Sequence, residues 1–207
     1  MNISYSILTH NENESLINLI DFLTDNMKDS DEIVIVDDYS DNKETKKILD
    51  TTVSTYNIKF EQRHLNKDFA SQKNYLDSLC ENEYIFNIDA DEIPHEILIS
   101  QLHDIVQMNE VDLIWVPRVN TVEGITTEHC VKWGWRINDK GWVNYPDYQA
   151  RIYKNVEHIK WINPVHETIN GVKTYSHLPP QEELSLYHKK TIDKQESQNE
   201  MYAGISR

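Results

Sequence analysis

The run YIFNIDADE, residues Tyr84 to Glu92, joins a short apolar segment directly to a cluster of acidic residues. Its aromatic and β-branched residues predict a strand, and continuous apolar character is typical of a strand that is buried on both faces of a parallel sheet. In an open parallel sheet, ligands bind beyond the carboxyl ends of the strands. The run therefore places Asp89 and Asp91 where a ligand would bind.

Strand-like and helix-like segments alternate on both sides of this run. Strands are expected at Ile3 to Thr9, Ile33 to Val36 and Ile58 to Glu61, and helices at Leu16 to Leu23, Thr45 to Leu49, Phe69 to Leu79 and from Pro94 to about Gln107. Alternation with short connections predicts an α/β fold, in which helices flank a mostly parallel sheet and the crossovers are right-handed.

After Val111 the sequence becomes richer in strand-like segments. Strands are expected at Leu113 to Val119, Cys130 to Ile137, Gln149 to Tyr153 and Val165 to Ile169, and a polar terminal helix at Ile192 to Ile205. No repeat or flexible linker divides the 207 residues. They predict a single domain with two halves, 1–110 and 111–190, followed by the terminal segment 191–207.

The composition excludes several classes of partner. The chain has 35 acidic and 20 basic residues, and its formal net charge is −15. This charge repels nucleic acid, so no nucleic-acid partner is expected. Two cysteines, Cys80 and Cys130, do not form a disulfide framework or a zinc motif. No leader and no transmembrane segment is recognised, so we expect a cytoplasmic protein.

Three polar clusters follow predicted strands, and together they indicate a metal site. The clusters are Thr9 to Glu12, Asp37-Asp38 and Asp89 to Glu92. Because parallel strands end at one edge of the sheet, these carboxylates would repel one another unless a cation lay among them. Asp89 and Asp91 are two residues apart, so in an extended chain both side chains project the same way. Hard oxygen ligands favour Mn²⁺ or Mg²⁺.

The same motifs, in this order, resemble those of the family-2 glycosyltransferases. The resemblance rests on SILTHNE at 6–12, IVIVDDYSD at 33–41 and DADE at 89–92, and extends over roughly residues 3 to 170. It implies a Rossmann-like GT-A fold and an inverting, metal-dependent hexosyltransferase. The expected donor is a nucleoside diphosphate sugar, with a UDP-linked, glucose-like hexose favoured, and the acceptor is a glycan, a lipid or a protein.

The resemblance also assigns the donor site to the first half of the chain, 1–110. The positions that match donor-binding residues of the family are Thr9, Asn11, Asp38, Lys73 and Asp89. Asp38 is the expected contact to the nucleotide base, and Asp89 is expected to face the ribose.

Metal and catalytic roles are assigned in the same way. Asp91 is expected to bind Mn²⁺ or Mg²⁺ between the two phosphates, and His188 matches a late histidine that GT-A enzymes place on the metal. The half 111–190 would hold the acceptor and the general base. Two residues, Glu167 and Asp147, remain candidates for the base that deprotonates the acceptor hydroxyl.

Other functions compete with this interpretation. A metal-dependent phosphohydrolase could use Asp89 as nucleophile and Asp91 as acid, and a nucleotidyltransferase would share the metal and the nucleotide. A non-catalytic module could bind a nucleotide sugar or a carbohydrate without turnover. Four tryptophans would serve either as a wall for stacking sugars or as core packing, namely Trp133, Trp135, Trp142 and Trp161.

Overall fold

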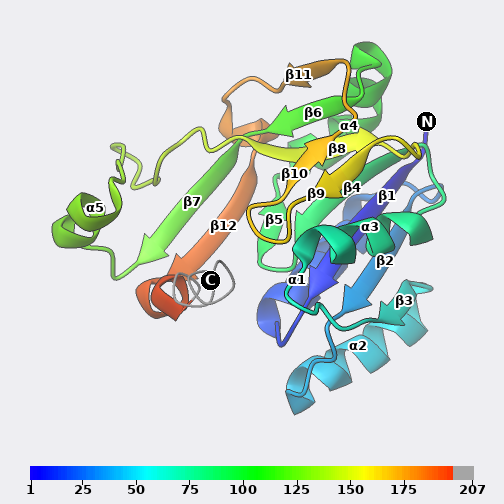
Figure 1. Ribbon diagram of the computed structural model, residues 1–207, viewed down its shortest axis with the longest axis horizontal. Coiled ribbons are helices and arrows are strands. Elements are labelled where there is room, and N and C mark those ends of the chain that lie inside the picture. Colours follow the sequence, from blue (N-terminus) through cyan, green and yellow to red (C-terminus); the bar gives the residue numbers. More distant parts are fainter. Residues whose placement is uncertain (198–207) are drawn as a thin grey trace.

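A computed structural model describes residues 1–197 and shows an α/β fold built around a seven-stranded sheet (Figure 1). The strand order is β11-β6-β8-β4-β1-β2-β3. Strands β4, β1, β2 and β3 are parallel, and β8 is antiparallel to both of its neighbours. The predicted α/β class with a mostly parallel sheet is therefore confirmed.

In the first half, the elements follow the order expected from the sequence, with one short strand added before the last helix. The first half contains β1 (Ile3–Thr9), α1 (Glu14–Asn26), β2 (Glu32–Asp37), α2 (Lys43–Tyr56), β3 (Lys59–Gln62), α3 (Phe69–Leu79), β4 (Tyr84–Asp89), β5 (Glu92–Pro94) and α4 (Glu96–Asn109). The second half contains β6 (Leu113–Val116), β7 (Arg118–Glu123), α5 (Thr127–Trp133), β8 (Gln149–Lys154), β9 (Lys160–Ile162), β10 (Thr168–Asn170), β11 (Tyr175–His177), the 3-10 helix η1 (Glu182–Leu184) and β12 (Leu186–Thr191).

Helices cover both faces of the large sheet. The apolar faces of α1, α2 and α4 pack on one side, in the cluster that contains Tyr5, Phe86 and Leu102. Helix α3 packs on the other side together with β9, in the cluster that contains Leu76 and Trp161. No helix within residues 1–197 is long and apolar enough to cross a membrane.

A second sheet joins the two halves of the chain. It has three strands in the order β5-β12-β7, with β12 antiparallel to β5 and parallel to β7. Because β5 directly follows the acidic end of β4, this sheet brings β7 and β12 from the second half beside the acidic cluster.

The register of the large sheet aligns the three polar strand ends. Thr9 at the end of β1 lies opposite Asp37 at the end of β2, and Leu8 lies opposite Asp89 at the end of β4. The polar clusters therefore meet at one edge of the sheet, as the sequence predicts.

Two expectations about helix ends have different outcomes. Asp68 caps α3 as expected, since its carboxylate accepts a hydrogen bond from the backbone N–H of Ser71 at 2.9 Å. Pro94 does not lie in the first turn of α4. It ends β5, and His95 is the N-cap, because the backbone of 92–94 pairs with β12.

Several expectations for the second half are wrong. The strand at Leu113 to Val119 is two strands, β6 and β7, with Pro117 between them. The first half of the strand expected at Cys130 to Ile137 belongs instead to the helix α5, which Thr126 caps and which Gly134 ends in a left-handed conformation. The strand at Val165 to Ile169 is limited to β10. The terminal segment is helical at 192–197, and the rest of the predicted helix lies outside the described residues.

A buried polar network fastens α3 to the strands beside it. The Tyr153 hydroxyl donates to the Asp77 carboxylate, with distances of 2.9 and 3.0 Å to its two oxygens, and accepts from Trp161 Nε1 at 3.0 Å. Burial raises the pKa of Asp77 to about 7, against the opposing effect of the Tyr153 hydrogen bond. A protonated carboxyl is therefore favoured in the folded protein at mildly acidic pH.

This network predicts that stability falls as pH rises. The unfolded chain releases the Asp77 proton near pH 4, whereas the folded chain holds it until about pH 7. Between these values the free energy of unfolding should lose up to about 1.4 kcal/mol per pH unit from this group. Urea unfolding of the wild type and of Asp77→Asn, from pH 5 to 9, measures the difference.

The free energy of unfolding of Asp77→Asn, relative to that of the wild type, should rise up to pH 7 and then level off, because the amide has no proton to release. Asp50→Asn, on the exposed face of α2, is the control and should follow the wild type. A difference between Asp77→Asn and the wild type that does not change with pH contradicts the prediction.

Candidate active site

A cavity of about 1250 Å³ opens at the carboxyl edge of the large sheet. Residues from both halves of the chain line it. Every site residue predicted from the sequence lies in this lining except Asn11, so the cavity contains Thr9, Asp38, Lys73, Asp89, Asp91, Asp147, Glu167 and His188. The structure therefore brings together residues that are up to 179 positions apart, from Thr9 to His188 (188 − 9).

Asn11 has a structural task beside the cavity. Its side-chain oxygen accepts hydrogen bonds from the backbone N–H groups of Asp41 and Asn42, both at 3.0 Å. Asn11 thereby ties the loop after β1 to the start of α2. Its predicted contact with the nucleotide-sugar donor would therefore have to be made by the loop rather than by this side chain.

The two aspartates at the end of β2 divide their roles. Asp37 is fully buried and closes the turn by accepting from the Ser40 backbone N–H at 2.9 Å and from Gln62 at 2.9 Å. Asp38 lines the cavity and accepts from the backbone N–H of Leu65 at 2.9 Å. Asp38 is thus the member of the pair that can contact a ligand.

Thr9 lies in the cavity wall. Its hydroxyl oxygen is buried and has no hydrogen-bond partner among residues 1–197. Buried hydroxyls are normally satisfied, so this atom is suited to a bound ligand or an ordered water.

An arginine holds the first aspartate of the acidic cluster. Arg151 on β8 is only 3% exposed, and its two terminal nitrogens lie 3.1 and 2.5 Å from the two Asp89 oxygens. Burial alone would raise the pKa of Asp89, but the charges of Arg151 and Lys73 outweigh it and hold that pKa well below its usual range. Asp89 is therefore ionised and fixed in direction.

The same arginine reaches Glu92, which is completely buried. Glu92 Oε1 accepts from Arg151 at 2.7 Å and from Arg118 at 2.8 Å, and Glu92 Oε2 accepts from the Asp89 backbone N–H at 3.1 Å. Two arginines of the second half thus supply part of the positive charge that was expected among the acidic strand ends. A signal for Arg151 was present in the sequence, since a charged residue within an otherwise buried strand requires a partner.

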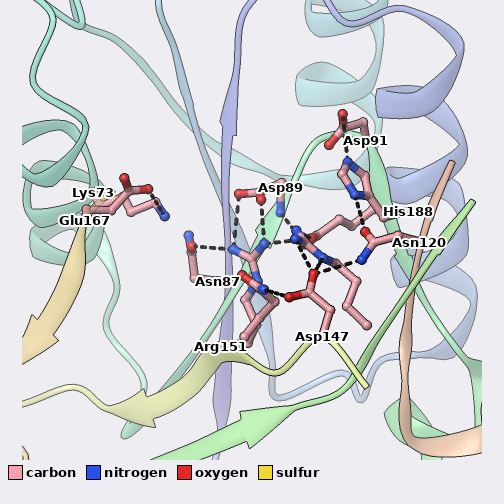
Figure 2. Close-up of polar contacts among 12 residues, drawn as sticks. Lys73, Asn87, Asp89, Asp91, Asn120, Asp147, Arg151, Glu167 and His188 are labelled. Carbon is pink, nitrogen blue, oxygen red and sulfur yellow. Dashed lines mark hydrogen bonds and ion pairs between the residues drawn. The ribbon is translucent and has the colours of Figure 1, made fainter. Parts of the chain in front are cut away.

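The second aspartate of the cluster faces a histidine. Asp91 Oδ2 lies 3.4 Å from His188 Nε2 (Figure 2). It also lies 3.1 Å from Lys194 Nζ. Burial would raise the pKa of Asp91, but the adjacent His188 ring and the charge of Lys194 outweigh it and hold that pKa below its usual value. Asp91 is an anion across the ordinary pH range.

The separation of Asp91 and His188 fits a divalent cation whose coordination is completed by a bound ligand. Two ligands on one Mg²⁺, each about 2.1 Å from it, lie roughly 3 Å apart, close to the observed separation. Within residues 1–197, no group of three or more His, Cys, Asp or Glu side chains could enclose a metal alone. Such incomplete protein ligation suits a cation whose other ligands are phosphate oxygens and water.

An ion pair lies on the other side of Asp89. Lys73 Nζ is 2.6 Å from Glu167 Oε1 and 4.1 Å from the centre of the Trp161 ring. The Glu167 side chain also lines the cavity. Figure 2 shows this pair on one side of Asp89 and the Asp91–His188 pair on the other.

Asp147 is surrounded by donors. Its Oδ2 accepts from Arg118 Nε at 2.9 Å, from Arg118 Nη2 at 2.6 Å and from Asn120 at 2.8 Å, and its Oδ1 accepts from Gln149 at 3.0 Å. Both oxygens of this carboxylate are therefore occupied by donors. This environment suits a residue that positions others.

The tryptophans occupy two different settings. Trp161 is 5% exposed and belongs to the core, although one edge lines the cavity. Trp133 and Trp135 lie 4.8 Å apart between ring centres, on an arm at 124–145 that extends away from the large sheet, where α5 buries no residue (Figure 1). Trp135 also lines the cavity.

Comparison with solved structures identifies the fold. The chain superimposes on S. aureus TarS residues 1–349 with a TM-score of 0.66 at 14% sequence identity, covering 91% of this chain and 60% of that one. For the same TarS fragment in complex with UDP-GlcNAc, the TM-score is 0.67 at 15% identity, covering 92% of this chain and 59% of that one. The chain thus spans about 60% of the length of these TarS chains.

Sequence comparison identifies the family. No curated protein matches the chain in sequence. The profile of the family described as Glycosyl transferase family 2 matches residues 4–172, which include all but the first residue of β1, the acidic cluster and Glu167. The expected family and GT-A fold are confirmed: the chain belongs to glycosyl transferase family 2.

Proposed function

We propose that the chain transfers a hexose from a nucleoside diphosphate sugar, with a UDP-linked, glucose-like donor favoured, to an acceptor hydroxyl with inversion at the anomeric carbon. The observation that carries the proposal is the shared cavity. In it, the Asp91–His188 pair and the carboxylate of Glu167 lie on opposite sides of Asp89.

The donor would lie along the edge of the large sheet. Asp38 would contact the base, while Thr9 and Asp89 offer polar atoms toward the ribose. Asp91 and His188 would hold Mn²⁺ or Mg²⁺ against the diphosphate. The cation, when bound, neutralises charge on the departing diphosphate. Such a cation would explain how a chain with a net charge of −15 binds an anionic donor.

Glu167 is the better of the two candidate bases. A base must take a proton from the acceptor hydroxyl, so it needs a carboxylate oxygen that other donors do not occupy. Glu167 uses Oε1 for Lys73, whereas both oxygens of Asp147 are occupied. Lys73 holds the Glu167 carboxylate at the cavity wall. We therefore assign proton removal to Glu167 and a positioning role to Asp147.

The competing enzymatic interpretations are less compatible with the contacts. A phosphohydrolase would need Asp89 as nucleophile, but the two-point contact with Arg151 stabilises its negative charge and weakens its attack. The contacts give no separate support to a nucleotidyltransferase, because it would use the same cavity residues as a glycosyltransferase. Release of UDP from the donor distinguishes a transferase from a module that binds without turnover.

The acceptor would approach beside the arm at 124–145. Trp135, Val143 and Asn144 of this arm line the same cavity as Glu167. Tryptophan faces suit the C–H faces of a pyranose, so among a glycan, a lipid and a protein we favour a glycan acceptor.

Removal of the metal carboxylate should abolish metal-dependent donor binding. We expect Asp91→Ala to lose the gain in UDP affinity that Mn²⁺ gives the wild type, since the cation would lose a ligand that faces the diphosphate. Isothermal titration of UDP, with and without Mn²⁺, measures this gain. Glu167→Gln and Asp50→Ala should retain it, because neither residue is placed on the metal. An unchanged gain in Asp91→Ala would falsify the metal assignment.

Neutralising the proposed base should affect turnover rather than binding. Glu167→Gln keeps the shape of the side chain and an oxygen for Lys73, yet removes the basic carboxylate. We expect its rate of sugar transfer, or of slow donor hydrolysis to UDP, to fall by roughly 10²–10⁴-fold with little change in UDP affinity.

Glu157→Gln, at an exposed position before β9, is the matched control and should turn over like the wild type. A panel of UDP- and GDP-linked hexoses, screened by thermal shift with Mn²⁺, identifies the donor before these assays. Mn²⁺-dependent binding with no UDP release from any donor, with or without glycans, would favour the binding module over the transferase.

A further inference from the structure

A chain of hydrogen bonds connects Arg118 to the proposed metal ligand His188. Arg118 donates to Asp147, and Asn120 Nδ2 donates to the same Asp147 oxygen at 2.8 Å. On the other side of the amide, Asn120 Oδ1 lies 2.8 Å from His188 Nδ1. The far nitrogen of the ring, His188 Nε2, faces Asp91 at 3.4 Å (Figure 2).

The strands of the small sheet fix the residues of this chain. Asn120 on β7 and His188 on β12 are direct partners in the parallel register, so their side chains emerge beside each other. Arg118 and Asn120 are two residues apart on β7 and therefore project from the same face. His188 is 7% exposed, so its ring has little freedom to turn.

The chemistry of the groups determines which atom is the donor at each step. Asp147 is bound to Arg118 as a carboxylate, and a carboxylate only accepts hydrogen bonds. The NH₂ group of Asn120 must therefore face Asp147, which leaves the carbonyl oxygen of the amide facing His188. A carbonyl oxygen also only accepts, so His188 Nδ1 must carry the hydrogen.

We infer that Asn120 and Asp147 are positioning residues that direct the lone pair of His188 Nε2 toward the metal site. An imidazole that donates through Nδ1 offers Nε2 as a ligand, and an outer hydrogen bond of this kind fixes both the tautomer and the ring orientation. The inference rests on the proposed function, because it concerns the cation that would be held with the donor.

The direction of the Asn120 amide provides the test. In Asp147→Asn the side chain at position 147 can donate as well as accept. The Asn120 amide is then free to turn its NH₂ toward His188. We expect the affinity for Mn²⁺ in the presence of UDP to fall about 10- to 100-fold, the usual cost of losing such a partner. The electron paramagnetic resonance signal of free Mn²⁺ measures this affinity without turnover.

The double variant Asn120→Asp with Asp147→Asn should restore binding. The carboxylate at position 120 accepts from His188 Nδ1, and the amide at position 147 donates to that carboxylate while its oxygen still accepts from Arg118. A purely structural loss at position 147 would not be recovered by a second substitution. Recovery of Mn²⁺ affinity to near the wild-type value is therefore the expected result.

A second variant and a spectroscopic signal guard against misfolding. Asn120→Leu keeps the branched shape of the side chain but removes both hydrogen bonds, and it should also lose Mn²⁺ affinity. In protein labelled with ¹⁵N-histidine, spin-echo spectra of bound Mn²⁺ should show coupling to a histidine nitrogen in the wild type and the double variant, and a weakened coupling in Asn120→Leu. Asn109→Leu, exposed at the end of α4, is the control. Thermal unfolding checks that each variant is folded.

The outcomes separate this inference from the proposed function. Wild-type affinity in Asp147→Asn, or a folded double variant that does not recover, overturns the positioning role and leaves the proposed function intact. A wild type that binds no Mn²⁺ with UDP overturns both. If Asp147 were instead the general base, the double variant would bind Mn²⁺ but would transfer no sugar.

Discussion

The buried carboxylate of Glu92, held between two arginines, is the contact on which the site depends. Glu92 has no exposed surface, and a buried charge is tolerated only when it is paired and hydrogen-bonded. Arg151 and Arg118 supply that pairing from β8 and β7. Each arginine also binds one further carboxylate, Asp89 or Asp147. The pairing thus joins the acidic end of β4 to the second half of the chain.

From this centre, hydrogen bonds lead outward to both aspartates of the DAD sequence. One path runs from Glu92 through Arg151 to Asp89. The other runs through Arg118, Asp147 and Asn120 to His188, which faces Asp91. The two aspartates therefore differ in their surroundings. Asp89 is paired with Arg151, whereas Asp91 faces His188 and Lys194.

This division changes how the strong negative charge should be interpreted. The repulsion among acidic strand ends indicated a metal, and part of the compensation comes instead from arginines that are remote in sequence. The cation in the proposed mechanism then has the narrower task of holding the donor diphosphate. Lys194, which pairs with both Asp91 and Glu12, also places positive charge at this end of the cavity.

The sequence by itself determined the order of elements in the first half, the meeting of three polar strand ends, and the family. These depend on local periodicity and on the rule that parallel strands end together. It did not determine α5, where a cap and a glycine override strand-like residues. Only the tertiary structure showed that Arg151 holds Asp89, that Asn11 ties a loop to α2, and that Asn120 links Asp147 to His188. Contacts between β5, β7, β8 and β12 decide these roles, and no local pattern records which distant donor a buried carboxylate will meet.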